Sequence, residues 1–245
     1  MQVSEDEPEK RAARGRTGRP RGAPGGGRRA AAVSRLPDAV AEELAGAARA
    51  PKVKGLPQRM AEAVRAYERD RYDDARRMLR RLAEEAPSAP AVRELYGLAL
   101  YRMGRWRDAI QELEEFHVLT GSYDQHPVLA DCNRAVGDTD RVAELWAELR
   151  VASPAGGVVA EGRLVAAGAM ADGGDLQGAT RLLERSERAR GSSKHAGVER
   201  LRTWYALADL YERAGDIPRA RDLFHRVLDH DPGLYDVAER LASLR

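Results

Sequence analysis

Apolar residues spaced three and four positions apart fill the segment between residues 204 and 232, and a glycine divides them into two groups. The first group precedes this glycine and the second follows it: Trp204, Leu207, Ala208 and Tyr211, then Ala220, Phe224 and Val227. Such spacing places apolar side chains on one face of a helix. Gly215 and Pro232 stand where the two helices would end. The segment therefore predicts two antiparallel helices whose apolar faces pack together.

The same pattern recurs upstream, so the hairpin is one unit of a series. A small or β-branched residue opens the second helix of each unit: Ala75, Ala109, Val142, Ala179 and Ala220. An apolar residue follows four positions later in each: Leu79, Leu113, Trp146, Leu183 and Phe224. The expected turn residues are Asp70, Gly104, Gly137, Gly174 and Gly215, and the units begin 34, 33, 37 and 41 residues apart. A single hairpin cannot bury its apolar face alone, so the series predicts stacked hairpins.

These residues resemble the tetratricopeptide repeat family, whose unit is a 34-residue helix-turn-helix, and in particular its small actinobacterial members. The resemblance implies an all-α, right-handed α-α superhelix, a solenoid of about five helical hairpins, over residues 56–245. The expected repeats are 56–89, 90–122, 123–156, 160–193 and 201–234. An amphipathic helix over 233–244 would cap the stack, and residues 36–55 are expected to form a short helix and a linker.

The first 35 residues differ in charge from the rest of the chain. They hold nine basic and four acidic side chains, a net charge of +5, whereas residues 36–245 carry −3, giving +2 overall. Between Lys10 and Arg29 there are eight basic groups, six glycines and no acidic residue. Such a segment has too little apolar surface to offset the entropy of ordering. We therefore expect residues 1–35 to form a disordered Arg/Gly-rich basic arm.

Two interpretations of this arm remain open. Flexible arginines neutralise phosphates without a fixed shape, so the arm could contact RNA, DNA or the ribosome surface. The residues that would make these phosphate contacts are Arg11, Arg14, Arg16, Arg19, Arg21, Arg28 and Arg29. The other interpretation is composition: arginine outnumbers lysine 37 to 4, as in a GC-rich genome, and the arm has no aromatic residue to stack on bases.

Motifs for catalysis, nucleotide binding and zinc binding are absent from the sequence. We expect a protein that is not an enzyme, with no catalytic residues, no metal and no cofactor. Cys132 could be drawn as a nucleophile with His126 as its base and Asp131 as an orienting group. However, Cys132 holds the inward position of Ala99 and Ala169 in other repeats, which favours a buried packing role.

The cysteine count and the length of the apolar runs indicate where the protein is located. The single cysteine excludes an internal disulfide, and no apolar run approaches the roughly 20 residues that span a bilayer. We expect a cytoplasmic protein with no membrane partner.

The resemblance also implies that the first helix of each hairpin lines a concave groove. The groove positions in this chain are Met60, Val64, Tyr67, Glu68, Glu94, Leu98, Tyr101, Arg102, Asp131, Arg134, Arg202, Tyr205, Asp209, Glu212 and Arg213. Tyrosine and arginine often dominate binding energy, and apolar residues gathered in a concavity mark partner sites. The charged members also fit a solvated surface.

Two functions follow from these patterns. The first is a non-enzymatic protein-protein interaction module or scaffold that binds a partner peptide or helix in the groove. The alternative is an RNA- or ribosome-associated accessory factor that uses the basic arm. A carboxylate clamp for a chaperone is not expected, because Met60 and Val64 stand where that clamp has a basic residue and an asparagine.

Overall fold

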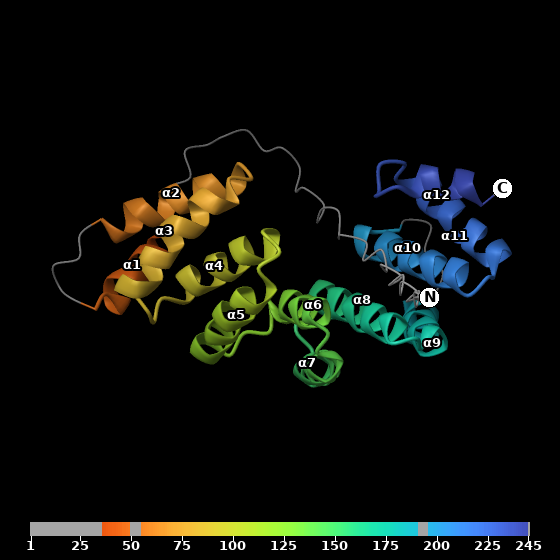
Figure 1. Ribbon diagram of the computed structural model, residues 1–245, viewed down its shortest axis with the longest axis horizontal. Helices are drawn as coiled ribbons and strands as arrows, with labels where there is room; N and C mark the ends of the chain where they lie inside the picture. Colours follow the sequence, from red (N-terminus) through yellow and green to blue (C-terminus); the bar gives the residue numbers. More distant parts are fainter. Residues whose placement is uncertain (1–35, 50–54, 191–195, 245) are drawn as a thin grey trace, which may run out of the picture. The chain divides into compact units, whose positions relative to one another are not determined.

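The computed structural model describes residues 36–49, 55–190 and 196–244, and within these ranges it contains helices and no strands (Figure 1). The twelve helices of the described residues are α1 (Asp38–Ala47), α2 (Leu56–Glu68), α3 (Tyr72–Glu85), α4 (Pro90–Arg102), α5 (Trp106–Thr120), α6 (His126–Val136), α7 (Thr139–Ala152), α8 (Gly156–Asp172), α9 (Leu176–Arg190), α10 (Val198–Arg213), α11 (Ile217–His230) and α12 (Val237–Ser243). The predicted all-α solenoid is confirmed. The basic arm predicted over residues 1–35 lies outside the described residues.

The helices pair into five hairpins, α2 with α3 through α10 with α11, and each helix packs against the next one along the chain. The first helices also contact one another, α2 with α4, α4 with α6, α6 with α8 and α8 with α10. These five first helices therefore share one continuous face, which we call the first-helix face. Helix α12 packs on α11 after the last hairpin.

All five predicted turn residues have a left-handed backbone. Their φ angles are 59° at Asp70, 72° at Gly104, 85° at Gly137, 91° at Gly174 and 80° at Gly215. A residue in this conformation ends a helix and reverses the chain. Glycine adopts it without a steric penalty, and aspartate is one of the few other residues that tolerates it. The turn within each hairpin is thus encoded locally.

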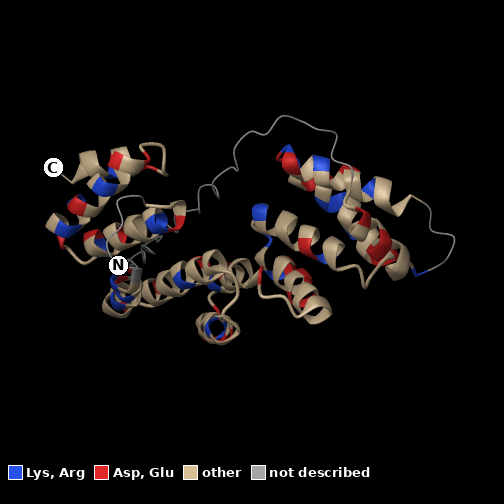
Figure 2. Ribbon diagram, turned by 180° about the vertical axis from the view of Figure 1, so that it is seen from behind, with Lys and Arg blue, Asp and Glu red and all other residues tan. Residues whose placement is uncertain are grey.

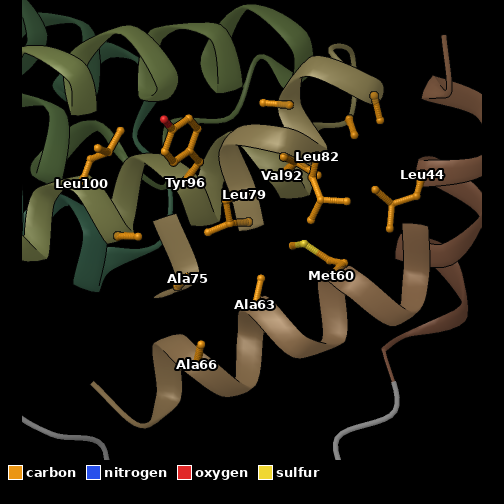
Figure 3. Close-up of a cluster of buried hydrophobic side chains, with 14 of the residues drawn as sticks. Leu44, Met60, Ala63, Ala66, Ala75, Leu79, Leu82, Val92, Tyr96 and Leu100 are labelled. Carbon is orange, nitrogen blue, oxygen red and sulfur yellow. The ribbon is translucent and has the colours of Figure 1, made fainter. Parts of the chain in front are cut away.

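The apolar core consists of three clusters of buried residues. The first cluster joins residues of α1 to α5 and Cys132, and Figure 3 shows its centre. The middle cluster contains Leu113, Leu129, Ala130, Val142, Leu145 and Ala169. The last cluster joins residues of α8 to α12 around Leu183, Trp204 and Phe224. The residues that open the second helices are at most 2% exposed in every repeat: Ala75, Ala109, Val142, Ala179 and Ala220.

The third hairpin departs from the expected register. Leu145 and Leu149 are each 1% exposed, whereas Trp146, expected to pack inward, lies at the edge of the core. Its ring lies 5.6 Å from the Arg163 guanidinium, a cation–π contact. Helix α8 approaches α7 closely because Gly162 has no side chain: a Cβ there would lie 2.2 Å from Leu149 Cδ2.

Candidate functional site

The predicted groove residues belong to the first helices α2, α4, α6 and α10. Val64, Tyr67, Leu98, Tyr101 and Tyr205 are half-buried there, so each shows part of its side chain at the surface. Met60 was expected to be exposed, and that expectation is wrong. It is 3% exposed and packs in the first cluster beside Leu44, a residue of α1 (Figure 3).

A chain of polar contacts crosses the middle of this face and links α4, α6 and α8. Tyr101 Oη donates a hydrogen bond of 2.8 Å to Asp131 Oδ2. Arg134 donates to Asp131 Oδ1 at 3.1 Å through Nη1 and to Asp172 Oδ2 at 2.7 Å through Nε. A Cβ at Gly168 would lie 3.1 Å from this guanidinium, so the glycine makes room for it.

The protonation states of this chain are set by burial and by partners. Burial, and next the Asp131 carboxylate, raise the pKa of Tyr101 well above its usual range, so the phenol keeps its proton. Burial tends to lower the pKa of Arg134, but its hydrogen bonds to Asp172 and Asp131 raise it more, so the guanidinium stays charged. The three repeats are thus joined by charge-assisted hydrogen bonds.

The charged groove residues of the last hairpin are paired within the chain. Arg240 of α12 donates to Asp209 Oδ1 at 2.8 Å and to Glu212 Oε2 at 2.6 Å. Arg213 donates to the Ala171 carbonyl at 2.8 Å. Tyr205 donates to Asp236, and its pKa is raised by burial and by this hydrogen bond.

Two further groove arginines also have partners. Arg202 pairs with Glu161 and donates to Tyr235 Oη at 3.0 Å. Arg102 lies exposed, 3.7 Å from Asp70 and over the Tyr72 ring. Arg134, Arg202, Asp209, Glu212 and Arg213 thus each pair with a residue of another helix.

Several residues that pair with the groove residues could not be predicted from the sequence. Glu161, Asp172, Asp236 and Arg240 complete the polar pairs, yet each is separated by at least 28 residues from the side chain it pairs with on another helix. No local spacing signals such a contact.

Cys132 has the properties of a packing residue. It is fully buried, and burial, then the Asp131 carboxylate, raise the pKa of its thiol to about 12. His126 Nε2 lies 3.2 Å from Glu148 Oε2, and its ring packs against His117 and Tyr123. A buried thiol that stays protonated at neutral pH is not an activated nucleophile.

Other predicted features have the following outcomes. Within residues 36–49, 55–190 and 196–244, no three His, Cys, Asp or Glu side chains gather as a metal site requires. No helix in this described part is both long and apolar enough to cross a membrane. Basic and acidic residues are interspersed along its helices (Figure 2). The seven arginines proposed for phosphate contacts, from Arg11 to Arg29, lie outside the described residues.

Comparison with known proteins identifies similar repeats. Tetratricopeptide repeat models match residues 60–116 and 201–244 of the chain. No curated protein matches it. It is similar to TTC0263, a thermophilic TPR protein in Thermus thermophilus, with 18% identity, a TM-score of 0.59, and coverage of 78% of this chain and 98% of that one. It is also similar to the APC/C hetero-tetramer Cut9-Hcn1, with 13% identity, a TM-score of 0.61, and coverage of 84% of this chain and 39% of that one. At these identities the likeness concerns the fold.

Proposed function

Because this chain belongs to the tetratricopeptide repeat family, we propose that it is a non-enzymatic interaction scaffold. Its first-helix face binds a peptide or helix from a partner protein. The observation that carries the proposal is the continuity of this face: five first helices contact each other in order. Half-buried apolar and aromatic side chains lie along it, among them Leu98, Tyr101 and Tyr205.

The side chains of this face suit a peptide partner. The tyrosines offer large contact areas with a polar end, at little cost in conformational entropy. The Tyr101–Asp131 hydrogen bond links α4 to α6, and the Arg134–Asp172 hydrogen bond links α6 to α8, before any partner binds. Preorganisation of this kind lowers the cost of binding.

A pull-down from native cell extract with the tagged full chain tests the proposal. The Tyr101→Ala, Tyr205→Ala double variant removes two aromatic contacts of the first-helix face, and we expect it to lose the prey. The matched control is Val118→Ala, Val151→Ala, on the second helices α5 and α7, where these side chains are 78% and 84% exposed. Thermal melts confirm that both double variants stay folded.

Two outcomes would contradict the proposal. Prey that the tyrosine double variant retains would show that binding does not use this face. Prey that is lost when residues 1–35 are removed, with affinity falling steeply as salt rises, would favour phosphate contacts by the basic arm.

A further inference from the structure

Helix α1 packs against α2 and reaches the end of α3 and the start of α4. Its Leu44 is completely buried beside Met60, Leu82 and Val92 (Figure 3). Val40, one turn earlier, is half-buried against the same cluster. An amphipathic helix of the chain itself thus lies beside Val64 and Glu94, two of the predicted groove positions.

Two hydrogen bonds fix the position of α1. Glu43 Oε1 accepts a 2.8 Å hydrogen bond from the Ala91 amide, in the first turn of α4. This contact caps the helix, because amides of a first turn have no partner within their own helix. The Arg49 amide donates to the Glu85 carbonyl at 2.8 Å, at the end of α3. Helix α1 therefore binds in one defined orientation, with an acidic side chain at the start of α4.

The fit of α1 is nevertheless incomplete. A pocket of about 260 Å³, open to solvent on one side, lies beside its first turn. Its lining is mostly apolar and includes three of the predicted groove positions, Met60, Val64 and Glu94. The other lining residues are Leu36, Pro37, Val40, Ala91 and Leu95. Side chains that line such a pocket have no protein atoms packed against them on that side. Helix α1 also lacks a side-chain N-cap and has Gly46 in its last turn, and both features weaken a helix. A helix with a larger side chain at the place of Val40 would fit better.

We propose that α1 is an intramolecular ligand of the groove, which a partner helix displaces. The partner helix carries large aliphatic residues four apart, at the places of Val40 and Leu44, and an acidic residue at the place of Glu43. This inference rests on the proposed function and adds to it the kind of partner and a means of regulation.

The tether makes α1 a strong competitor. Seven residues, 49–55, separate Ala48 from α2, and a short linker gives an effective concentration on the order of 1 mM. If the free helix binds with a Kd of roughly 0.1 mM, the tethered copy weakens binding of an external helix about tenfold. A partner must therefore bind more tightly than α1 does.

The test uses a fluorescein-labelled peptide of residues 36–49, whose binding to the full chain is followed by fluorescence anisotropy. The Val40→Asp chain should release its own α1, because it places a carboxylate against an apolar wall of the pocket. The matched control is Ala45→Asp, which introduces the same residue at an exposed position of α1. We expect the Val40→Asp chain to bind the peptide about tenfold more tightly than the wild type and the control do.

A second variant covers the case in which Val40→Asp fails to fold. Val40→Leu adds one methylene group facing the pocket, so in the full chain it should weaken peptide binding about fourfold below the wild type. The same change in the peptide should strengthen its binding to the Val40→Asp chain.

Equal peptide affinity for the wild type and both Val40 variants would overturn the inference, and so would absence of binding to a folded Val40→Asp chain. Either result would show that α1 is a fixed part of the fold and is not displaced. The tyrosine double variant leaves the sequence of α1 unchanged, and the peptide experiment changes only α1, so failure of this inference and failure of the proposed function are distinguishable.

Discussion

At Gly97, in the middle of α4, the absence of a side chain decides how closely two helices approach. A Cβ at this position would lie 2.6 Å from Leu113 Cδ2 and 2.7 Å from its Cγ. Leu113 is 1% exposed and packed in the middle cluster, so it cannot move aside freely. The packing of α4 against α5 therefore depends on this glycine.

We expect Gly97→Ala to lower the free energy of unfolding by about 1–3 kcal/mol, the usual cost of overpacking a core. Where there is room for the methyl group, replacing a helical glycine by alanine ordinarily raises the free energy of unfolding by up to about 1 kcal/mol. Gly46→Ala in α1 is the matched control, because a Cβ there meets nothing within 4 Å, and it should be neutral or stabilising. Urea denaturation compares the two, and a stabilised Gly97→Ala chain would refute the packing argument.

Single residues differ in how far their roles could be predicted from the sequence. The turn residues were predictable, because the need for a left-handed backbone at Gly104 or Gly215 is local. The pairing of Arg134 with Asp172 was not, because the two residues are 38 positions apart in the sequence. Met60 was misjudged for the same reason, since it packs in a cluster with residues of other helices, among them Leu44 and Leu82.

At the scale of helices, α5, α6 and α7 meet at the His126 side chain. This histidine is 2% exposed, its ring centroid lies 4.6 Å from those of His117 and Tyr123, and its Nε2 is 3.2 Å from Glu148 Oε2. Burial lowers the pKa of His126 below its ordinary value of 6.5, and the hydrogen bond to Glu148 opposes this shift without cancelling it. The folded protein therefore favours the neutral imidazole at the start of α6.

This pKa shift predicts a pH dependence of stability. Above pH 6.5 the imidazole is mostly neutral in both the folded and the unfolded chain, so the contribution of His126 to the free energy of unfolding is fully present. As the pH falls, the unfolded chain takes up a proton first, and the contribution is lost as the pH falls through the folded pKa. Between about pH 7.5 and about pH 5, the wild type should lose more free energy of unfolding than His126→Gln, as measured by urea titrations.

The control for this experiment is His230→Gln, at an exposed position of α11. It should retain the pH dependence of the wild type. If His126→Gln and the wild type lose stability in parallel, the buried imidazole is not the group that responds to pH.

The helices themselves were predictable, but the rotation of one was not. In α7, regular spacing pointed to Trp146, and the structure buries Leu145 and Leu149 instead. Both choices place apolar residues on one side of a helix, so periodicity alone does not separate them. The deciding factor is α8, whose Gly162 admits Leu149 at close range.

Across the whole described chain, stability is distributed over three clusters, each built from helices that are close in sequence. In such repeats each hairpin contacts only its neighbours, so the total stability is approximately a sum of hairpin and interface terms. A defect at one end should therefore leave the other end ordered.

We expect Phe224→Ala to lower the free energy of unfolding by about 3–5 kcal/mol, because Phe224 is completely buried in the last cluster. Hydrogen-exchange mass spectrometry should show lost protection over residues 198–243 and little change over residues 56–109. Leu79→Ala, in the first cluster, should give the reverse pattern. Uniform loss of protection in either variant would show that the clusters unfold as one unit.

The docking of α1 also guides the preparation of recombinant fragments. A fragment that begins at α2 would contain every hairpin, yet it would uncover Met60, Leu82 and Val92, which Leu44 now covers. An apolar surface newly open to solvent favours self-association and precipitation. Crystallisation and binding trials should therefore start no later than residue 36.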